Sequence, residues 1–277
     1  MPMPTRLVLL GHPVAHSLSP TFQNAALQAA HLAPRYEAVD VSYATLGATL
    51  RSLVAEGAAG NVTIPHKERV AALCDVLTPL ATRLGAVNTW WTSDGALHGD
   101  NTDVGGFDDA VAALLGELPR GAIRVAVLGA GGSARAVVAA VGGWPAARLA
   151  IWGRTPARAA PLLALGPAGA TTVEELVGDA VRGADLIVNT TPVGMRDDQL
   201  PVEPRLLPVG AACLDLVYRR DSLTPFVRAA RAQGRRADDG LRMLVSQGAR
   251  SWMRWFGRAA DGDAMWHAAC EASTGRS

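Results

Sequence analysis

Short apolar runs alternate with amphipathic stretches of helical periodicity along most of this chain. In the first part of the sequence, predicted strands occupy residues 6–11, 36–42 and 57–65, and predicted helices follow them at 19–32, 43–57 and 68–77. Alternation of strands and helices is typical of a parallel sheet that carries helices on its faces. We therefore predict an α/β fold for this part of the chain.

Two local signals sharpen that prediction. Ser19 is expected to be the N-cap of the first helix, with Pro20 at the first helical position. Asp94 and Gly95 form a dipeptide that is typical of a tight β-hairpin turn. A further helix is predicted at 104–116.

A Pro-Arg-Gly break at 119–121 precedes a second α/β segment. Its predicted strands occupy 123–128, 147–153, 184–191 and 212–218. The segment 240–257 reads as a helix that bears several aromatic side chains. The pattern thus predicts a second parallel sheet with helices on both faces.

Composition narrows the class of protein. The chain has 277 residues, of which 49% are hydrophobic, and a net charge of +1, so it lacks the basic character of nucleic-acid-binding domains. Its three cysteines have no zinc-ligand spacing and suggest neither a metal site nor a disulfide framework. No apolar run is long enough for a signal peptide or a membrane span. We expect a cytoplasmic protein that binds neither nucleic acid nor membranes.

The turn after the strand at 123–128 indicates a dinucleotide site. Gly129, Ala130, Gly131, Gly132, Ser133 and Ala134 fit the pattern G-x-G-x-x-A between a strand and a helix. The glycines allow close approach of a pyrophosphate to the positive end of the helix.

The end of the next strand favours NADP over NAD. That strand end carries no acidic residue for a ribose 2′-hydroxyl. It carries Arg154 and Arg158, four residues apart, which could bind a 2′-phosphate, and Thr155 as a candidate helix cap. Two exposed arginines without a ligand are the alternative interpretation.

Lys67 is the only lysine in the chain, and the other 25 of its 26 Lys and Arg residues are arginine. An amine can release and accept a proton, whereas a guanidinium stays charged. Polar residues stand near other strand ends as well: Ser17 and Ser19, Thr63, Asn88 and Asp103. Each could instead cap a helix or stabilise a turn. Beside a nicotinamide site, Lys67 and Asp103 could together move the hydroxyl proton of an alcohol.

At this point the sequence resembles the shikimate dehydrogenase family. The motifs that carry the resemblance follow one another along nearly the whole chain: "GHPVAHSLSP", "GNVTIPHK", "GAVNT", "GDNTDVGGF", "GAGGSARA", "GRTPAR", "NTTPVGM", "DLVY" and "GLRMLVSQGA". The resemblance implies reversible, NADPH-dependent reduction of 3-dehydroshikimate to shikimate, a step of aromatic amino-acid and chorismate biosynthesis. It also implies a discontinuous substrate domain, here 1–103 with 239–277, and a Rossmann domain for NADP at 104–238.

The resemblance further implies roles for individual residues. Lys67 and Asp103 would be the catalytic pair. The substrate would be held by Ser17, Ser19, Thr63, Asn88, Tyr218 and Gln247. NADP would be bound by Gly129, Ala130, Gly131, Gly132, Ser133, Ala134, Arg154, Thr155 and Arg158, with Leu216, Gly240 and Met243 at the nicotinamide end.

The sequence departs from the family pattern at three places. Gly153 replaces the Asn that usually precedes the first arginine, and Gln23 replaces a usual His. The usual Tyr-x-Pro-x-x-Thr is "YRRDSLT" here, without the Pro and with one extra residue.

Two alternative functions stay open. One is a quinate/shikimate dehydrogenase that prefers NAD, although quinate users tend to have Thr in place of Ser19. The other is a non-catalytic sensor of shikimate or nucleotide, which would be expected to lack the Lys or the Asp. The oligomeric state is open too, with a homodimer as one alternative.

Overall fold

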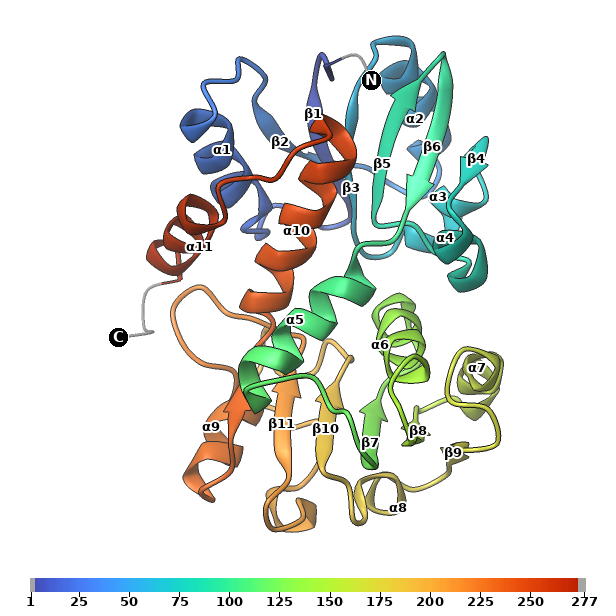
Figure 1. The fold of residues 1–277 in the computed structure, drawn as a ribbon, viewed down its shortest axis with the longest axis vertical. Helices are drawn as coiled ribbons and strands as arrows, with labels where there is room; N and C mark the ends of the chain where they lie inside the picture. Colours follow the sequence, from blue (N-terminus) through green and yellow to red (C-terminus); the bar gives the residue numbers. More distant parts are fainter. Residues whose placement is uncertain (1–2, 274–277) are drawn as a thin grey trace. The chain divides into compact units, whose positions relative to one another are not determined.

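The protein is described here by a computed structural model of residues 3–273, which divides into two compact units (Figure 1). Unit 1 comprises the chain up to Gly106 together with Leu244–Ala272. Unit 2 comprises Phe107–Met243, and Ser273 belongs with it. Unit 1 is therefore discontinuous in the sequence. The divisions lie a few residues after the boundaries that the resemblance implies, inside two helices.

The sheet of unit 1 is mixed. Its six strands have the order β2-β1-β3-β5-β6-β4, in which β1, β2 and β3 are parallel. β5 is antiparallel to β6, as the predicted hairpin at Asp94 and Gly95 requires, and it is also antiparallel to β3. Both turn residues have the positive φ of that hairpin class. The strands are β1 (Leu7–Gly11), β2 (Tyr36–Asp40), β3 (Ala59–Val62), β4 (Val76–Leu77), β5 (Thr89–Ser93) and β6 (Ala96–Asp100).

The described part of unit 1 also contains six helices, of which α4 and α11 were not predicted from the sequence. They are α1 (Ser19–Ala29), α2 (Leu46–Ala55), α3 (Lys67–Ala71), α4 (Pro79–Leu84), α10 (Leu241–Phe256) and α11 (Gly262–Glu271). The C-terminal helices pack against α1. The side chain of Gln23 donates a hydrogen bond to the Gly248 carbonyl at 3.1 Å. A side chain at position 248 would lie 2.5 Å from the Phe22 ring, so only glycine allows this close approach.

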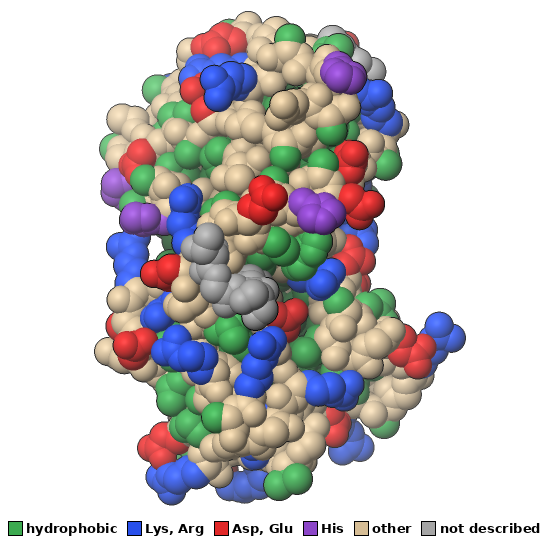
Figure 2. Space-filling view, turned by 90° about the vertical axis from the view of Figure 1, so that its left-hand side faces the viewer, with side chains coloured by type: hydrophobic (Ala, Val, Ile, Leu, Met, Phe, Trp, Pro, Cys, Tyr) green, Lys and Arg blue, Asp and Glu red, His purple; other side chains and the backbone are tan. Residues whose placement is uncertain are grey.

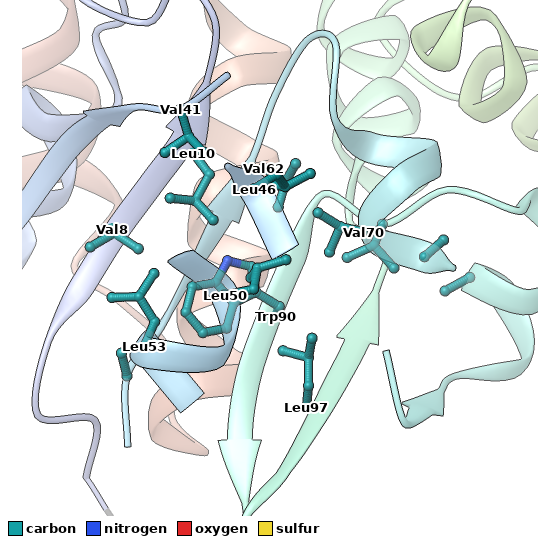
Figure 3. Close-up of a cluster of buried hydrophobic side chains, with 14 residues drawn as sticks. Val8, Leu10, Val41, Leu46, Leu50, Leu53, Val62, Val70, Trp90 and Leu97 are labelled. Carbon is teal, nitrogen blue, oxygen red and sulfur yellow. The ribbon is translucent and has the colours of Figure 1, made fainter. Parts of the chain in front are cut away.

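One hydrophobic core of unit 1 lies between the sheet and α2 (Figure 3). The fully buried Trp90 of β5 stands among aliphatic side chains of the strands, and Leu46 and Leu50 of α2 pack near it. Burial of a large side chain of this kind stabilises the fold by about 2–3 kcal/mol. This core holds the strands whose ends carry the candidate site.

Unit 2 contains a fully parallel six-stranded sheet of order β12-β11-β10-β7-β8-β9. Read from β9, this is the strand order of a Rossmann fold. The strands are β7 (Ile123–Leu128), β8 (Ala147–Trp152), β9 (Thr171–Glu174), β10 (Leu186–Asn189), β11 (Ala212–Asp215) and β12 (Ala237–Asp238). The helices are α5 (Asp103–Leu115, beginning in unit 1), α6 (Gly132–Gly142), α7 (Pro156–Ala159), α8 (Val177–Val181), α9 (Pro225–Ala232) and the short 3₁₀ turns η1 (Ala160–Ala164) and η2 (Pro204–Leu206).

Two local predictions were wrong, and some short elements were missed. The helix predicted at 68–77 ends at Ala71, and Val76–Leu77 instead pairs with β6 as β4. Ser19 is the first residue of α1 rather than its N-cap, which is Leu18. β9 and α8, of four and five residues, were not predicted.

The surface carries both signs of charge. On the face drawn in Figure 2, arginines and acidic side chains are interspersed with uncharged surface. Within residues 3–273, no helix combines the length and the apolar character that crossing a membrane requires.

Candidate active site

The candidate site of unit 1 forms at one edge of its sheet. β1 and β3 are parallel, so the residues that follow them lie at a shared carboxyl edge. β5 runs antiparallel to β3, so the residue before β5 lies at that edge, and β6 returns to it. Asn88 precedes β5, Asp103 follows β6 and Lys67 begins α3. The topology thus brings together residues that are distant in the sequence.

Lys67 and Asp103 form a short ion pair. Lys67 Nζ donates to Asp103 Oδ2 at 2.6 Å, and the two side chains are only 12% and 6% exposed. Asp103 is the first residue of α5, where the helix dipole favours a negative charge. Charges with so little solvent contact require a partner, because an unpaired buried charge is costly. The pair places a proton donor and a proton acceptor side by side.

Neighbouring amides fix the carboxylate of this pair. Asn88 Nδ2 donates to Asp103 Oδ1 at 2.8 Å and lies 3.0 Å from Gln247 Oε1. The backbone N–H of Asp103 donates to Asn101 Oδ1 at 3.1 Å, which holds the start of α5. Asn88 is therefore hydrogen-bonded both to the ion pair and to Gln247, which lies 159 positions farther along the chain.

A second buried amide, Asn61, was missed by the sequence analysis. It lies inside β3, where its Oδ1 accepts from the Tyr36 hydroxyl at 2.8 Å. Its Nδ2 donates to Ser251 Oγ at 2.8 Å and to the Asn88 carbonyl at 3.0 Å. Burial raises the pKa of the Tyr36 phenol well above its ordinary value, so it is a neutral donor. The available signal was an Asn within an apolar strand, a residue type that strands disfavour.

The predicted hydroxyl residues lie beyond the ends of β1 and β3. Ser17 Oγ donates to Ser19 Oγ at 3.2 Å, and the backbone N–H of Ser19 donates to Ser17 Oγ at 3.2 Å. Thr63 follows β3, and its N–H donates to the Leu10 carbonyl at 2.8 Å. Its methyl carbon lies 2.5 Å from where a Cβ at Gly11 would be, so a larger residue at position 11 would displace Thr63.

The Gly-rich turn of unit 2 fits a dinucleotide. Gly129 has a φ of 124°, and its N–H donates to the Trp152 carbonyl at 2.7 Å, which ties the turn to β8. Gly131 is the N-cap of α6, and a Cβ at that position would meet no atom within 4 Å. The amino end of α6 is therefore open to an anion, which the helix dipole would favour. Ala134 is buried under the turn.

The end of β8 carries the predicted arginines. Arg154 and Arg158 are exposed, and no acid ends this strand. Thr155 is the N-cap residue of α7, although its side chain makes no capping hydrogen bond. Gly153 lies close to the Gly-rich turn, since a Cβ there would be 3.3 Å from the methyl group of Ala130.

The residues predicted at the nicotinamide end gather after β11. The N–H of Gly240 donates to the Val217 carbonyl at 3.0 Å, and a Cβ at position 240 would lie 2.2 Å from the Leu216 carbonyl. Only glycine permits this approach. Met243 is buried in the first turn of α10, and Tyr218 follows β11 in the same loop as Leu216.

Asp215, the last residue of β11, is a buried carboxyl group in unit 2. Burial raises its pKa to about 6, and the charge of Asp239 adds to the rise. Hydrogen bonds from Thr224 Oγ1 at 2.7 Å, Val217 N–H at 3.1 Å and Asn189 Nδ2 at 2.8 Å oppose it. This side chain ties the end of β10 to the loop after β11.

No group of three or more His, Cys, Asp and Glu side chains that could hold a metal ion occurs in the described part of the chain. The three cysteines are free thiols, and burial raises the pKa of Cys74 and of Cys213 to about 12. Neither thiol is therefore activated as a nucleophile.

The fold and the two polar clusters define the class of protein. An α/β unit with a buried Lys–Asp pair, joined to a Rossmann unit with an open Gly-rich turn, is typical of a nicotinamide-nucleotide-dependent oxidoreductase. The family model "Shikimate dehydrogenase substrate binding domain" matches residues 9–90, and "Shikimate 5'-dehydrogenase C-terminal domain" matches 240–270. The chain belongs to the shikimate dehydrogenase family.

Individual members of the family are similar to this chain over nearly its whole length. The shikimate dehydrogenase (NADP(+)) of Moorella thermoacetica is 42% identical over 92% of this chain and 88% of that protein. The shikimate dehydrogenase (NADP(+)) of Symbiobacterium thermophilum is 43% identical over 98% of this chain and 95% of that protein. A crystal structure of shikimate 5-dehydrogenase from Thermus thermophilus with NADP(H) and shikimate has a TM-score of 0.86 and 39% identity, and covers 96% of this chain and 99% of that one.

Proposed function

We propose that this protein is an NADP-dependent shikimate dehydrogenase, which reversibly reduces 3-dehydroshikimate to shikimate. The observation that carries the proposal is the buried Lys67–Asp103 pair, with Nζ and Oδ2 2.6 Å apart, in a member of this family. Such a pair suits a reaction in which an alcohol oxygen gains or loses a proton.

The proton is the part of the reaction that this chain handles. During reduction the pair gives a proton to the carbonyl oxygen of the substrate, and during oxidation it receives the hydroxyl proton. Bound NADPH supplies the hydride. Asn88 supports the pair, because its amide holds the Asp103 carboxylate at 2.8 Å and thereby keeps Oδ2 directed at Lys67. The proton and the hydride together account for the two hydrogens that distinguish shikimate from its ketone.

The substrate would be held by hydroxyl and amide side chains of the same edge. Ser17 and Ser19 would bind its carboxylate, while Thr63, Asn88 and Gln247 would bind its hydroxyl groups. Tyr218 would contribute from the loop after β11. Asn61 is buried in the same hydrogen-bonded network as Asn88 and would support it.

NADP would be bound by the Gly-rich turn and the two arginines of unit 2. The amino end of α6 is open to the pyrophosphate, and Arg154 and Arg158 are exposed at the end of β8. A guanidinium there favours the 2′-phosphate of NADP, because charge-assisted hydrogen bonds to phosphate are strong. Leu216, Gly240 and Met243 would lie at the nicotinamide end.

Initial rates with four substrate–cofactor pairs test this function. Absorbance at 340 nm follows the oxidation of shikimate and of quinate with NADP and with NAD. We expect the highest kcat/KM for shikimate with NADP. A preference for quinate or NAD would favour the alternative dehydrogenase, and binding without any change in absorbance would favour a sensor.

Two substitutions of Lys67 test its role. Lys67→Ala should lower kcat by about 100-fold or more, because general acid–base groups contribute on the order of 10²–10⁴. Lys67→Arg keeps the positive charge beside Asp103 but cannot release a proton, so it should not restore kcat. The dissociation constant of shikimate, measured by calorimetry, should change much less than kcat. Near-normal turnover of either variant would refute the assignment.

The cellular setting is part of the proposal. Three free cysteines agree with a reducing, cytoplasmic location. Sedimentation velocity would decide between a monomer and a homodimer.

A further inference from the structure

Two loops of unit 2 follow adjacent parallel strands. We call residues 190–203 the β10 loop and residues 216–223 the β11 loop. β10 and β11 pair in register, with Asn189 opposite Asp215, so both loops leave the same edge of the sheet. The β11 loop is the segment in which this sequence departs from the family pattern, because it lacks the usual proline and is one residue longer.

The side chain of Arg219 joins the two loops at their exposed parts. Its Nε donates to the Gly194 carbonyl at 2.8 Å, and its Nη2 donates to the Asp197 carbonyl. Its Nη1 lies 3.4 Å from Asp198 Oδ1. The guanidinium thus uses three nitrogens on consecutive parts of the β10 loop. Its side chain is only 16% exposed, unlike that of Asp198, which is 80% exposed.

The β10 loop is preshaped to receive this guanidinium. Gly194 has a φ of 85°, a conformation that favours glycine, and its N–H donates to Asp197 Oδ1 at 3.1 Å. The same carboxylate oxygen accepts from the N–H of Gln199 at 3.1 Å. These bonds close a compact turn whose carbonyl oxygens remain available to Arg219.

Buried groups fix the other end of both loops. Asp215 accepts from Asn189 Nδ2, and it accepts from the N–H of Val217 and from the hydroxyl of Thr224, where the β11 loop ends. Both loops are therefore anchored at the strand ends by Asp215 and linked farther out by Arg219. A proline would stiffen such a loop by fixing φ. In this chain the arginine provides the restraint through side-chain hydrogen bonds.

We propose that Arg219 is a positioning residue for the cofactor, which holds the β10 loop and the β11 loop in the arrangement that NADP requires. Ligands of open α/β sheets bind at the carboxyl ends of the strands, where these two loops lie. The β11 loop also carries Leu216 and Tyr218. The inference rests on the proposed function for the identity of the nucleotide, but the link between the loops is a property of the ligand-free protein.

Hydrogen–deuterium exchange of the ligand-free protein tests the link directly. Arg219→Ala should speed exchange in the β10 loop by about tenfold or more. The substitution removes hydrogen bonds from a charged donor, and the free energy of each such bond corresponds to about a tenfold change in an equilibrium constant or more. Arg219→Lys should restore only part of the protection, since one ammonium cannot span both carbonyls. Arg148→Ala removes the same charge from an exposed position of β8, outside both loops, and should exchange like the unsubstituted protein.

Binding measurements connect the link to the cofactor. The dissociation constant of NADP, measured by calorimetry, should rise about tenfold in Arg219→Ala and remain unchanged in Arg148→Ala. Unchanged exchange, complete restoration by lysine, or faster exchange with an unchanged constant for NADP would each overturn the proposal. Failure of the unsubstituted protein to oxidise shikimate with NADP would refute the proposed function instead, and the exchange and NADP-binding results would still decide the role of Arg219.

Discussion

Asp215 should make unit 2 more stable in mild acid than at neutral pH, and Asp215→Asn should remove that dependence. The carboxyl group is buried, and its pKa is raised to about 6. In the unfolded chain its pKa would be about 3.9. The folded state therefore binds the proton more tightly than the unfolded state. The resulting stabilisation is fully present below about pH 4 and is lost as the pH rises through about 6.

The magnitude follows from the shift in pKa. A difference of about two units corresponds to about 3 kcal/mol between the protonated and ionised forms of Asp215. About 2 kcal/mol of this falls between pH 4.5 and pH 7, because the group is already partly ionised in the unfolded chain at pH 4.5. Asparagine keeps the oxygen that accepts from Asn189 and Val217, and it cannot ionise. The variant should therefore gain about 2 kcal/mol relative to the parent as the pH rises.

Urea unfolding at a series of pH values measures this difference. Hydrogen exchange of β10 and β11 is the probe confined to unit 2. Tryptophan fluorescence follows both units, because Trp144 and Trp152 lie in unit 2 and the other five tryptophans lie in unit 1. The quantity of interest is the free energy of unfolding of the variant minus that of the parent. Curves that stay parallel between pH 4.5 and pH 7 would refute the reasoning, because they would mean that Asp215 ionises in the folded protein as it does in the unfolded chain.

Two further predictions concern packing and cofactor choice. Gly60→Ala should destabilise unit 1 by about 3 kcal/mol, because the new Cβ would lie 1.9 Å from the Val8 carbonyl oxygen in the neighbouring strand. Gly47→Ala on α2, where the Cβ meets nothing closer than 3.6 Å, should stabilise by about 0.5–1 kcal/mol and serves as the control in thermal unfolding. Arg154→Ala should raise the KM for NADP about tenfold and leave the KM for NAD nearly unchanged, since an Arg–phosphate contact is specific to the 2′-phosphate. An equal change for both nucleotides would mean that Arg154 does not bind that group.

The fold was largely predictable because its signals are local and strong. Individual elements are specified by the Gly-rich turn at Gly129, by the hairpin dipeptide Asp94–Gly95 and by the buried apolar runs. The order of the elements follows from the series of family motifs, and the chain does belong to that family. The exceptions depend on distant partners. Val76–Leu77 is a strand because it pairs with His98 and Gly99 of β6, which no local periodicity reveals.

The candidate site was only partly predictable, for a similar reason. Lys67 and Asp103 stand out by residue type and by resemblance, and the structure joins them at 2.6 Å. Asn61 and Ser251 form a hydrogen bond across 190 positions. The sequence around Asn61 and the sequence around Ser251 contain no local pattern from which this contact could be predicted. Their functional roles stay predictions until the variants are measured.

The single lysine of this chain gives it an unusual chemical property. The other 25 Lys and Arg residues are all arginine, so Lys67 carries the only side-chain amine that an amine-selective reagent can modify. Reductive methylation with a ¹³C-labelled reagent would place one side-chain label, at the ion pair with Asp103. The α-amino group of the chain would also be methylated, so the resonance of Lys67 would be assigned by its loss in Lys67→Arg. Because Lys67 is the only lysine, its candidate catalytic amine can be observed by spectroscopy without any other substitution in the protein.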